Sequence, residues 1–444
     1  MSDWLATMKT ADEEIKYSLK ILQGRSRNLA MNNDYAKKYI KMCVANIVGP
    51  NGVVFQNKSR NERGTLDIPA NLRIEEHFLE WGKKGSCTAD GKLSWIDIQR
   101  LIIETVAKDG EVFINLVRNQ EINKYGLSLQ LIESEYIDTQ YNKDLENNKK
   151  IRLGIEFDKW NKPQAYYITK KANTMQYVRI PAENIIHLYI CERPNQSRGV
   201  PWMHTAMTRL HRLGGYEEAA LMKARIAACE ALFITQTEES AFGSSVEKED
   251  KMIDLEPGLI QKLAPGQNIV DWNPQYPTGE FDPFMKRLLK GIASGLNISY
   301  NSLASDLESV SYSSIRSGSI EERDSWRILQ NWFTINFCQI IFEKWLESAL
   351  ILNAIGLPFS KFKKFNAPRW YVRGWQWVDP LKDAKANIDS IDSGLKTRSQ
   401  VIAEQGYDVE DVFEELQHEK ELAEQYGLEF KNPKKEGITY QVNE

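Results

Sequence analysis

The feature that most constrains this fold is a long helical pattern in the C-terminal half, whose apolar residues spread over more than one side. The capping box from Ser319 to Glu322 predicts its start, and the pattern continues to residue 352. Its apolar positions are Ile328, Leu329, Trp332, Phe333, Ile335, Phe337, Ile340, Ile341, Trp345 and Leu346. A helix with so wide an apolar surface must be buried on several sides. The rest of the chain therefore has to pack around it.

The N-terminal part of the chain changes from a helical to a strand-like period. Apolar residues three and four apart predict helices over residues 35–48 and 72–84, and a third helix from Ser94 to Gly110. Residues 111–190 form short β-branched and aromatic runs, divided by Asn, Lys, Gly and Pro. This pattern predicts an antiparallel β region. The alternating stretch ESEYID within it predicts a strand edge whose charges face water.

Two helices separated by a turn-rich stretch follow the β region. They are predicted over 202–233 and 282–298, and the Pro-Gly turns between them indicate a small, partly β insertion over 234–280. The predicted buried face of the first helix consists of Ala206, Leu210, Leu213, Leu221, Ala224, Ala228 and Ala231. Its small residues would let another helix approach closely, although alanine is also simply the best helix former. With a pair of charged helices after residue 380, the predicted fold class is α+β.

The composition excludes several classes of protein. With 444 residues, of which 42% are hydrophobic and 27% charged, the chain is long enough for more than one cooperative unit and is not disordered overall. A net charge of -4 gives no general attraction to nucleic acid or anionic membranes, so any contact with DNA must be local or weak. The N-terminus has no apolar signal region, and no run of about 18 apolar residues occurs, so we predict no membrane segment.

The cysteines give no sign of a disulfide framework. No two of them form a Cys-x-x-Cys pair, which favours a reducing compartment and a buried, apolar role for each. They are Cys43, Cys87, Cys191, Cys229 and Cys338.

No cluster of residues with catalytic chemistry stands out. The scattered candidates are His187 with Cys191, His204 with His211, the carboxylates Glu133, Glu135 and Asp138, and the hydroxyls Ser313 and Ser314. A zinc site needs three or four ligands, and a serine nucleophile needs a base, so none of these sets is complete. The glycine-rich loops that bind nucleotides are also missing. We therefore predict no enzyme activity, no cofactor and no metal site. A nuclease is the remaining enzymatic alternative, which metal-dependent DNA cleavage would reveal.

The stretch NSLASDLESVSYSSIRSG, residues 301–318, has no apolar period although it directly precedes the longest predicted helix. A loop of this length inside a compact domain is usually either functional or disordered. We favour a functional loop, and a disordered serine-rich connection is the alternative.

Seven segments in order resemble the lambda-type portal proteins of tailed bacteriophages. The first two are GRSRNLAMNNDYAKKYIKMCVANIVGPNG (24–52) and DIQRLIIETVAKDGEVF (97–113). The strands QLIESEYID and GIEFDKWNKPQAYYI follow, and then IIHLYICERPNQSRGVPW (185–202). The series ends with IASGLNISYNSLASDLESVSYSSIRSG and WQWVDPLKDAKANIDSIDSGLKTRSQVIAEQGYDVEDV. No single motif is decisive, but their joint order and spacing are specific.

The resemblance implies a ring, dodecameric in the family, at one vertex of the capsid. Double-stranded DNA passes through its axial channel during packaging and ejection. The family's parts would be a β-containing wing (1–200), a first stem helix (201–233), a small α/β clip (234–280), a second stem helix (281–299), a tunnel loop (300–317), the long helix with the C-terminal wing (318–379), and a helical crown with the tail (380–444).

By this resemblance, the serine-rich stretch is the loop that approaches DNA in the channel. Its candidate contact residues are Asn301, Ser302, Ser305, Ser309, Ser311, Ser313, Ser314 and Arg316. Hydroxyl groups would offer weak, exchangeable contacts to phosphates, while Asp306 and Glu308 would discourage tight binding. Lys286, Arg287 and Lys290 on the second stem helix would face DNA, a neighbouring subunit or solvent.

The resemblance also sets expectations for residues outside the channel and for partners. Arg198 is expected to stabilise its turn, and Trp375 and Trp377 are expected to pack between crown and wing. The implied partners are the large terminase subunit at the clip, the major capsid or scaffold protein, and head-tail connector proteins, in the virion and, during assembly, in the host cytoplasm. The short stretches before GRSRNL and after YGLEF give no expectation of terminal processing or of a long polar tail. A head-tail adaptor or minor capsid protein is the structural alternative.

Overall fold

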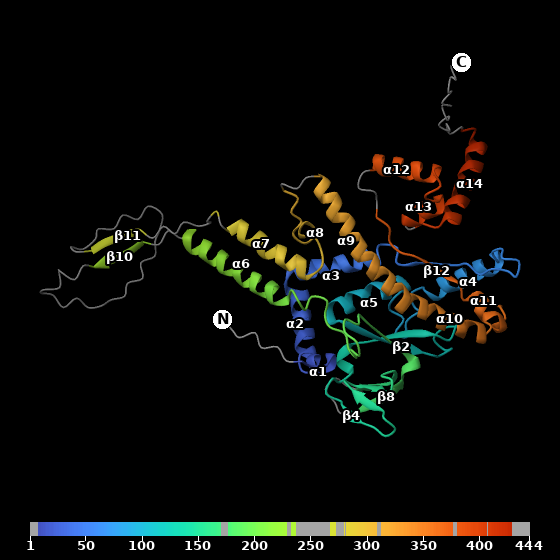
Figure 1. Cartoon of the computed structure of the whole chain (residues 1–444), viewed down its shortest axis with the longest axis horizontal. Coiled ribbons are helices and arrows are strands. Elements are labelled where there is room, and N and C mark those ends of the chain that lie inside the picture. The colour runs from blue at the N-terminus through green and yellow to red at the C-terminus, as the bar shows by residue number, and fades with distance from the viewer. Residues whose placement is uncertain are drawn as a thin grey trace, which may run out of the picture. The chain divides into compact units, whose positions relative to one another are not determined.

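The structure is a computed structural model that describes residues 8–169, 176–228, 232–236, 267–271, 279, 281–308, 312–375, 380–405 and 407–428. The chain forms two compact units, a large unit of residues 1–204 with 307–444 and a small unit of residues 205–306. Figure 1 labels many of the elements of both units, and each unit is described by itself.

The large unit begins with three helices, α1 (Ala11–Ile15), α2 (Leu19–Asn32) and α3 (Asp34–Ile47). Asn33 separates the last two, and its side chain accepts a hydrogen bond from the Ala36 backbone N–H, which caps α3. The apolar face of α3 packs against α5, as the sequence pattern predicts.

Helices α4 (Ile68–Trp81) and α5 (Trp95–Asp109) are also confirmed. Ser94 and Asp97 form a capping box at the start of α5. Gly110 ends the helix with a φ of +88°, which glycine adopts without strain. Strand β1 (Val54–Asn57) lies between α3 and α4 in the chain, and it pairs antiparallel with the distant strand β12 (Pro368–Tyr371).

Two antiparallel sheets confirm the predicted β region. In the first, β2 (Glu111–Val117) lies between β3 (Ser128–Ile132) and β9 (Ile185–Tyr189). The second has the order β4 (Lys143–Asp144), β5 (Lys150–Arg152), β6 (Ile155–Phe157), β7 (Pro163–Thr169) and β8 (Tyr177–Pro181). A shared apolar core joins them, made of Phe113, Ile137, Ile155, Phe157, Tyr166, Ile168 and Ile185.

The stretch ESEYID is not a strand edge. Residues Ser134–Tyr136 form a short 3-10 helix, and the side chain of Ser134 is buried. The chain bends here because it must leave β3 and enter the second sheet. The predicted strand is therefore wrong at this position, although Glu133 and Glu135 are exposed, as expected.

The long helix runs from α9 (Tyr312–Phe333) through a π-helical segment (Thr334–Cys338) into α10 (Gln339–Ile351). Its core side chains pack against aromatic residues of α4 and α5. The ring centres of Phe78 and Trp345 are 5.0 Å apart, and those of Trp95 and Phe337 are 5.2 Å apart. Burial on several sides is confirmed only in part, since Ile328 is 71% exposed.

The predicted helix start at the Ser319 capping box is wrong, because α9 already begins at Tyr312. The first turns of α9 carry serines and no apolar period, so the sequence pattern does not reveal them. A tertiary contact favours the helical form instead. Arg316 forms an ion pair of 2.6 Å with Asp383 of α12 (Pro380–Asp392). Residues 312–317 therefore belong to a helix and not to a loop.

The C-terminal part of the large unit contains two short helical turns, Phe359–Lys361 and α11 (Phe362–Phe365), and then three helices. These are α12, α13 (Arg398–Glu404) and α14 (Val409–Tyr426), so the predicted charged pair is confirmed with one helix added. Asp408, which caps α14, accepts a hydrogen bond from the Tyr371 hydroxyl and pairs with Lys58.

The small unit contains α6 (Met207–Ala228), the antiparallel strands β10 (Leu232–Gln236) and β11 (Gln267–Asp271), α7 (Phe281–Gly295) and α8 (Tyr300–Ala304). Helices α6 and α7 lie side by side (Figure 1). Their contact buries Leu210 and Leu213 of α6 and Leu289 and Ile292 of α7. The strand pair confirms the partly β character of the predicted insertion.

The predicted helix over 202–233 is wrong at both ends. Residues 202–206 form turns, because the Trp202 backbone N–H donates to the Ala107 carbonyl. Phe233 lies in β10, where it pairs with Val270 of β11. The predicted buried face also ends early, since Leu221 is 54% exposed. Residue 231 and the side chain of residue 228 lie outside the description.

Three cysteines, Cys43, Cys87 and Cys338, are buried as predicted, but Cys191 is exposed. Cys191 follows β9 in a surface turn, where its thiol contacts the Arg193 carbonyl. Cys229 lies outside the described residues. Among the helices that are described, none has the length and apolar character needed to span a bilayer.

Candidate functional site

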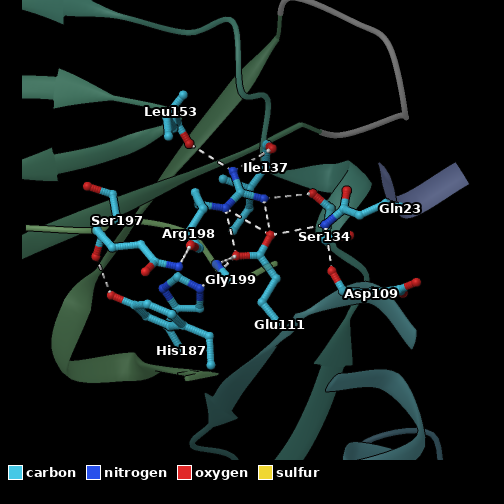
Figure 2. A network of polar contacts seen from close by, with 12 residues as sticks. Gln23, Asp109, Glu111, Ser134, Ile137, Leu153, His187, Ser197, Arg198 and Gly199 are labelled. Atoms are coloured by element: carbon cyan, nitrogen blue, oxygen red, sulfur yellow. Dashed lines mark hydrogen bonds and ion pairs between the residues drawn. The ribbon is translucent and has the colours of Figure 1, made fainter. Parts of the chain in front are cut away.

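The most connected polar group of the large unit surrounds Arg198 and Glu111, and it is completely buried (Figure 2). The Arg198 guanidinium pairs with the Glu111 carboxylate, with Nη2 at 2.5 Å from Oε1 and Nε at 2.9 Å from both oxygens. Its remaining donors bond to backbone carbonyls of Leu153, Ile137 and Ser134. The ion pair is therefore saturated with hydrogen bonds, as a buried pair must be.

Two further groups complete the coordination of the Glu111 carboxylate. The Gly199 backbone N–H donates to Oε2 over 3.0 Å, and His187 Nε2 lies 3.0 Å from the same oxygen. Because an ionised carboxylate can only accept, the His187 ring must donate through Nε2. Gln23 of α2 adds a longer contact of 3.4 Å to Oε1.

The local backbone explains why these groups meet. Gly110 and Gly199 approach so closely that a Cβ on Gly199 would lie 2.1 Å from the Gly110 carbonyl oxygen. Glu111 opens β2 directly after this contact, and Arg198 ends the PNQSRG turn after β9. Since β2 and β9 are neighbouring strands, their register brings the start of one beside the end of the other.

The electrostatics keep the pair ionised and the histidine neutral. Burial alone would raise the pKa of Glu111, but the positive charge of Arg198, together with hydrogen bonds from His187 and Arg198, lowers that pKa to about 2. Burial lowers the pKa of His187, and the nearby Glu111 charge only partly opposes this. At neutral pH the network therefore holds one negative charge against one positive charge.

This network positions backbone and has no opening for a substrate. Its side chains are fully buried, and they fix the segment that leads out of the large unit at residue 204. The interpretation of Arg198 as a turn-stabilising residue is confirmed. Sequence reasoning missed Glu111, although a charged residue at the start of the apolar run EVFINLV was a usable signal.

The basic residues predicted for the second stem helix lie on α7 of the small unit. Lys286 pairs with Asp282 at 3.0 Å and with Asp306 at 3.8 Å. The Lys290 ammonium lies 5.5 Å from the centre of the Tyr300 ring, and Arg287 is exposed. Carboxylates of the same unit thus balance part of the positive charge of α7.

The predicted loop residues fall into three groups. Asn301 and Ser302 lie in α8, whose cap is the Ser299 hydroxyl, and this hydroxyl donates to Ser302 Oγ over 2.8 Å. Ser305 ends α8 with a φ of +56°. Ser313, Ser314 and Arg316 lie in α9 and are not in a loop, because that helix begins at Tyr312. Ser309 and Ser311 lie outside the described residues.

The candidate catalytic and metal-ligating residues do not form a site. Glu135 pairs with Arg27, and Asp138 bonds to Lys20 and to the Tyr177 hydroxyl. Within the ranges that the structure describes, no group of three His, Cys, Asp or Glu side chains is arranged to hold a metal ion. The guanidinium groups of Arg323 and Arg327 each make a cation–π contact with the Trp375 ring. Trp377 lies outside the described residues.

The sequence comparisons place this chain in the class of phage structural proteins. The family model described as "Phage portal protein, lambda family" matches residues 1–330, and the chain belongs to this family. Portal proteins are structural, non-catalytic components of the virion. The resemblance stated from the seven sequence segments is thus confirmed.

Relatives that are named as portal proteins agree with this membership. The chain is 31% identical to a "Probable portal protein" of Halomonas phage phiHAP-1, over 94% of this chain and 83% of that protein. It is 20% identical to portal protein B of Escherichia phage lambda, over 98% and 89% of the two chains. A chain from the neck of an empty gene transfer agent particle covers 90% of this chain at 11% identity, with 96% of that chain matched and a TM-score of 0.46.

Proposed function

We propose that this chain assembles into a ring of about twelve copies, by the family resemblance, at one capsid vertex, and that double-stranded DNA enters and leaves through its axial channel. The observation that carries the proposal is the family match over residues 1–330. In this assignment the large unit supplies the wing and crown. In the small unit α6 and α7 are the stem helices, and β10 with β11 belongs to the clip.

The surface of the small unit supports assembly. Leu221, Met222 and Phe284 are 54%, 51% and 48% exposed in the single chain, and Tyr216 is 38% exposed. Neighbouring apolar side chains that stay in water usually mark a surface that another molecule covers. Copies of the same unit, repeated around a ring axis, would cover them.

The charge of α7 suits a conduit for DNA. Lys286 is weakened as a phosphate ligand, because it pairs with Asp282 and Asp306. A channel with many unopposed cations would bind DNA with an affinity that rises steeply as salt falls. Among the described residues, those from Ser305 to Glu308, which follow α8, are the remaining candidates for a loop that approaches DNA.

The partners follow from the same assignment. The clip would receive the large terminase subunit, the wing would contact capsid or scaffold protein, and connector proteins would bind after packaging. Assembly would take place in the host cytoplasm, and the finished ring would stay in the virion. A head-tail adaptor or minor capsid protein would not account for the portal family match over most of the chain.

Electron micrographs of the purified chain test this proposal. We expect end-on views with a central hole wide enough for a duplex. Leu221→Lys together with Met222→Lys should reduce ring formation, whereas Val178→Lys, which changes a 41% exposed apolar residue of the wing sheet, should not. A monomer under all assembly conditions, or rings with a closed centre, would refute the proposed function.

Packaging assays test the role of α7. Lys286→Gln, Arg287→Gln and Lys290→Gln in one chain should leave rings intact and reduce the amount of DNA retained per particle. The matched control is Lys159→Gln, an exposed wing lysine above Trp160. Unchanged packaging by the triple variant would place these cations away from DNA.

A further inference from the structure

Helix α14 is almost entirely exposed in the single chain. From Phe413 to Leu428, only Ala423 is buried. Phe413 and Leu416 are 51% and 53% exposed, three residues apart and therefore on one side of the helix. A helix of 18 residues gains most of its stability from packing. The large exposed apolar surface of α14 therefore indicates a missing partner.

The same side of α14 is acidic. Glu421 and Glu424 lie eight and eleven residues after Phe413, which places them on the face that Phe413 and Leu416 share. Both are exposed, and Lys420 is a cation on the same side of the helix. This α14 face, defined by Phe413, Leu416, Glu421 and Glu424, offers an apolar group at one end and negative charge at the other.

A pocket with the complementary character lies elsewhere in the large unit. It has a volume of about 670 Å³, and residues from the end of α3, from α9, from the chain after β12 and from the turn before α14 line it. We name it the arginine pocket, and its defining residues are Arg323, Arg373, Trp375, Tyr371, Val54 and Pro50.

Arginine side chains gather at the arginine pocket, with Arg323 and Arg373 in its lining and Arg327 beside Trp375. Arg323 and Arg327 both lie 5.9 Å from the Trp375 ring centre. Burial lowers the pKa of Arg323, and the charges of Arg327 and Arg373 lower it further, with Asp383 only partly opposing them. Asp383 itself pairs with Arg316, and Arg373 bonds to neutral oxygens of Ala45 and Asn46.

The shape of the pocket favours a protein segment over DNA. Phosphates of a duplex lie on a stiff, convex surface, and side chains that project from a protein are the ones that reach them. The Arg323 side chain lies in a recess between aromatic and aliphatic groups. An acidic helix that also carries apolar side chains fits such a lining in both charge and polarity.

We propose that the α14 face of one copy docks into the arginine pocket of the next copy in the ring. This proposal rests on the proposed function, because it needs a cyclic assembly. Rotation about a ring axis keeps equivalent elements at the same level, and Tyr407 of the pocket lining directly precedes α14. Donor face and pocket are different surfaces, which is the heterologous contact that closes a ring.

A charge exchange tests the contact. Arg323→Glu alone should weaken assembly, measured by native mass spectrometry over a series of NaCl concentrations, by at least about tenfold in the apparent dissociation constant. Glu421→Lys with Glu424→Lys should weaken it similarly. All three changes in one chain should restore much of the loss, and such a rescue would not arise from a general defect in folding.

Two matched variants on α14 sharpen the test. Glu415→Lys with Glu419→Lys carries the same charge change on the opposite side of the helix, and it should not rescue Arg323→Glu. Lys420→Glu should make wild-type rings more resistant to salt, because it removes the cation from the α14 face.

The outcomes separate the two proposals. Normal wild-type rings together with no effect of Arg323→Glu, or equal rescue by both pairs of lysines, would overturn the docking and leave the portal function standing. Rings that stay intact in Arg323→Glu but lose packaged DNA would also overturn it, since the pocket would then serve phosphate. A wild-type chain that never assembles would refute both proposals.

Discussion

Arg198 and Glu111 show how a small number of buried charges fixes the backbone at the exit of the large unit. The pair joins residues 87 positions apart and leaves no donor of the guanidinium pointing into an apolar space. Removing one partner from such a pair leaves a buried charge without compensation. The single variants should therefore be far more harmful than the same changes at the surface.

Arg198→Ala should destabilise the chain by about 3–5 kcal/mol, because it strands the Glu111 carboxylate in the core. Urea unfolding followed by circular dichroism measures the change. Arg152→Ala is the matched control, since its partner Asp144 is 83% exposed and exposed pairs contribute about 1 kcal/mol or less. Equal losses for the two variants would contradict the structural role of the network.

The same pair predicts an acid-sensitive contribution to stability. The pKa of Glu111 is lowered from 4.5 to about 2 in the folded chain, so the unfolded chain binds the proton more readily. The stabilisation is complete above pH 4.5 and is lost as the pH falls towards 2. The lowered pKa of His187 acts in the same direction below its ordinary value of 6.5.

Unfolding free energies of the wild type and of Glu111→Gln over this pH range measure the effect. Near neutral pH the wild type should have a larger free energy of unfolding than Glu111→Gln, and this difference should shrink as the solution becomes more acidic. A difference in unfolding free energy that stays constant from neutral pH to pH 2 would show that the pKa of Glu111 is not lowered in the folded chain.

At the scale of elements, the long helix depends on a few aromatic anchors and not on its whole apolar surface. Phe337 is completely buried between Trp95 and Phe333, whereas Ile335, two residues away, is 55% exposed. Phe337→Ala should cost about 3–5 kcal/mol because it opens a cavity that close-packed neighbours fill only in part.

Ile335→Ala is the matched control in the same helical segment. It should change the stability of the single chain by about 1 kcal/mol or less. Thermal unfolding of both variants under conditions that prevent assembly measures the difference. A larger loss of stability for Ile335→Ala than for Phe337→Ala would show that burial does not determine which of the two side chains stabilises the chain more.

The sequence allowed most elements to be predicted, but not their ends. Helices α3 and α5 were found because their apolar residues keep a helical period and because Ser94 and Gly110 mark the ends of α5. The first turns of α9 escaped, since the Arg316–Asp383 ion pair favours helix where serines give no period. Likewise, the predicted stem helix ran too far, into residues that form β10. The strand partner β11 lies far along the chain, so the local pattern does not reveal the pairing.

The candidate site was less accessible to sequence reasoning than the fold. Arg198 was correctly placed in a structural role, but its partner Glu111 is distant in sequence and belongs to another strand. The basic residues of α7 were found, whereas their balance by Asp306 depends on how α8 turns back toward α7. Contacts of this kind depend on tertiary structure, which local period does not encode.

For the whole molecule, apolar side chains that stay in water link assembly to stability. Leu221 and Met222 of the small unit and Phe413 of the large unit are all about half exposed in one copy. If the ring covers them, assembly binds the folded chain and not the unfolded chain, so apparent stability must rise with protein concentration.

A series of thermal unfolding curves at increasing chain concentration measures this coupling. Each tenfold increase should add up to about 1.4 kcal/mol of apparent stability per chain, and the midpoint Tm should rise accordingly. Leu221→Lys with Met222→Lys should give a Tm that does not depend on concentration and that matches the dilute wild type. A wild-type Tm that is constant over the whole series would mean that water, and not a neighbouring copy, is the permanent environment of these side chains.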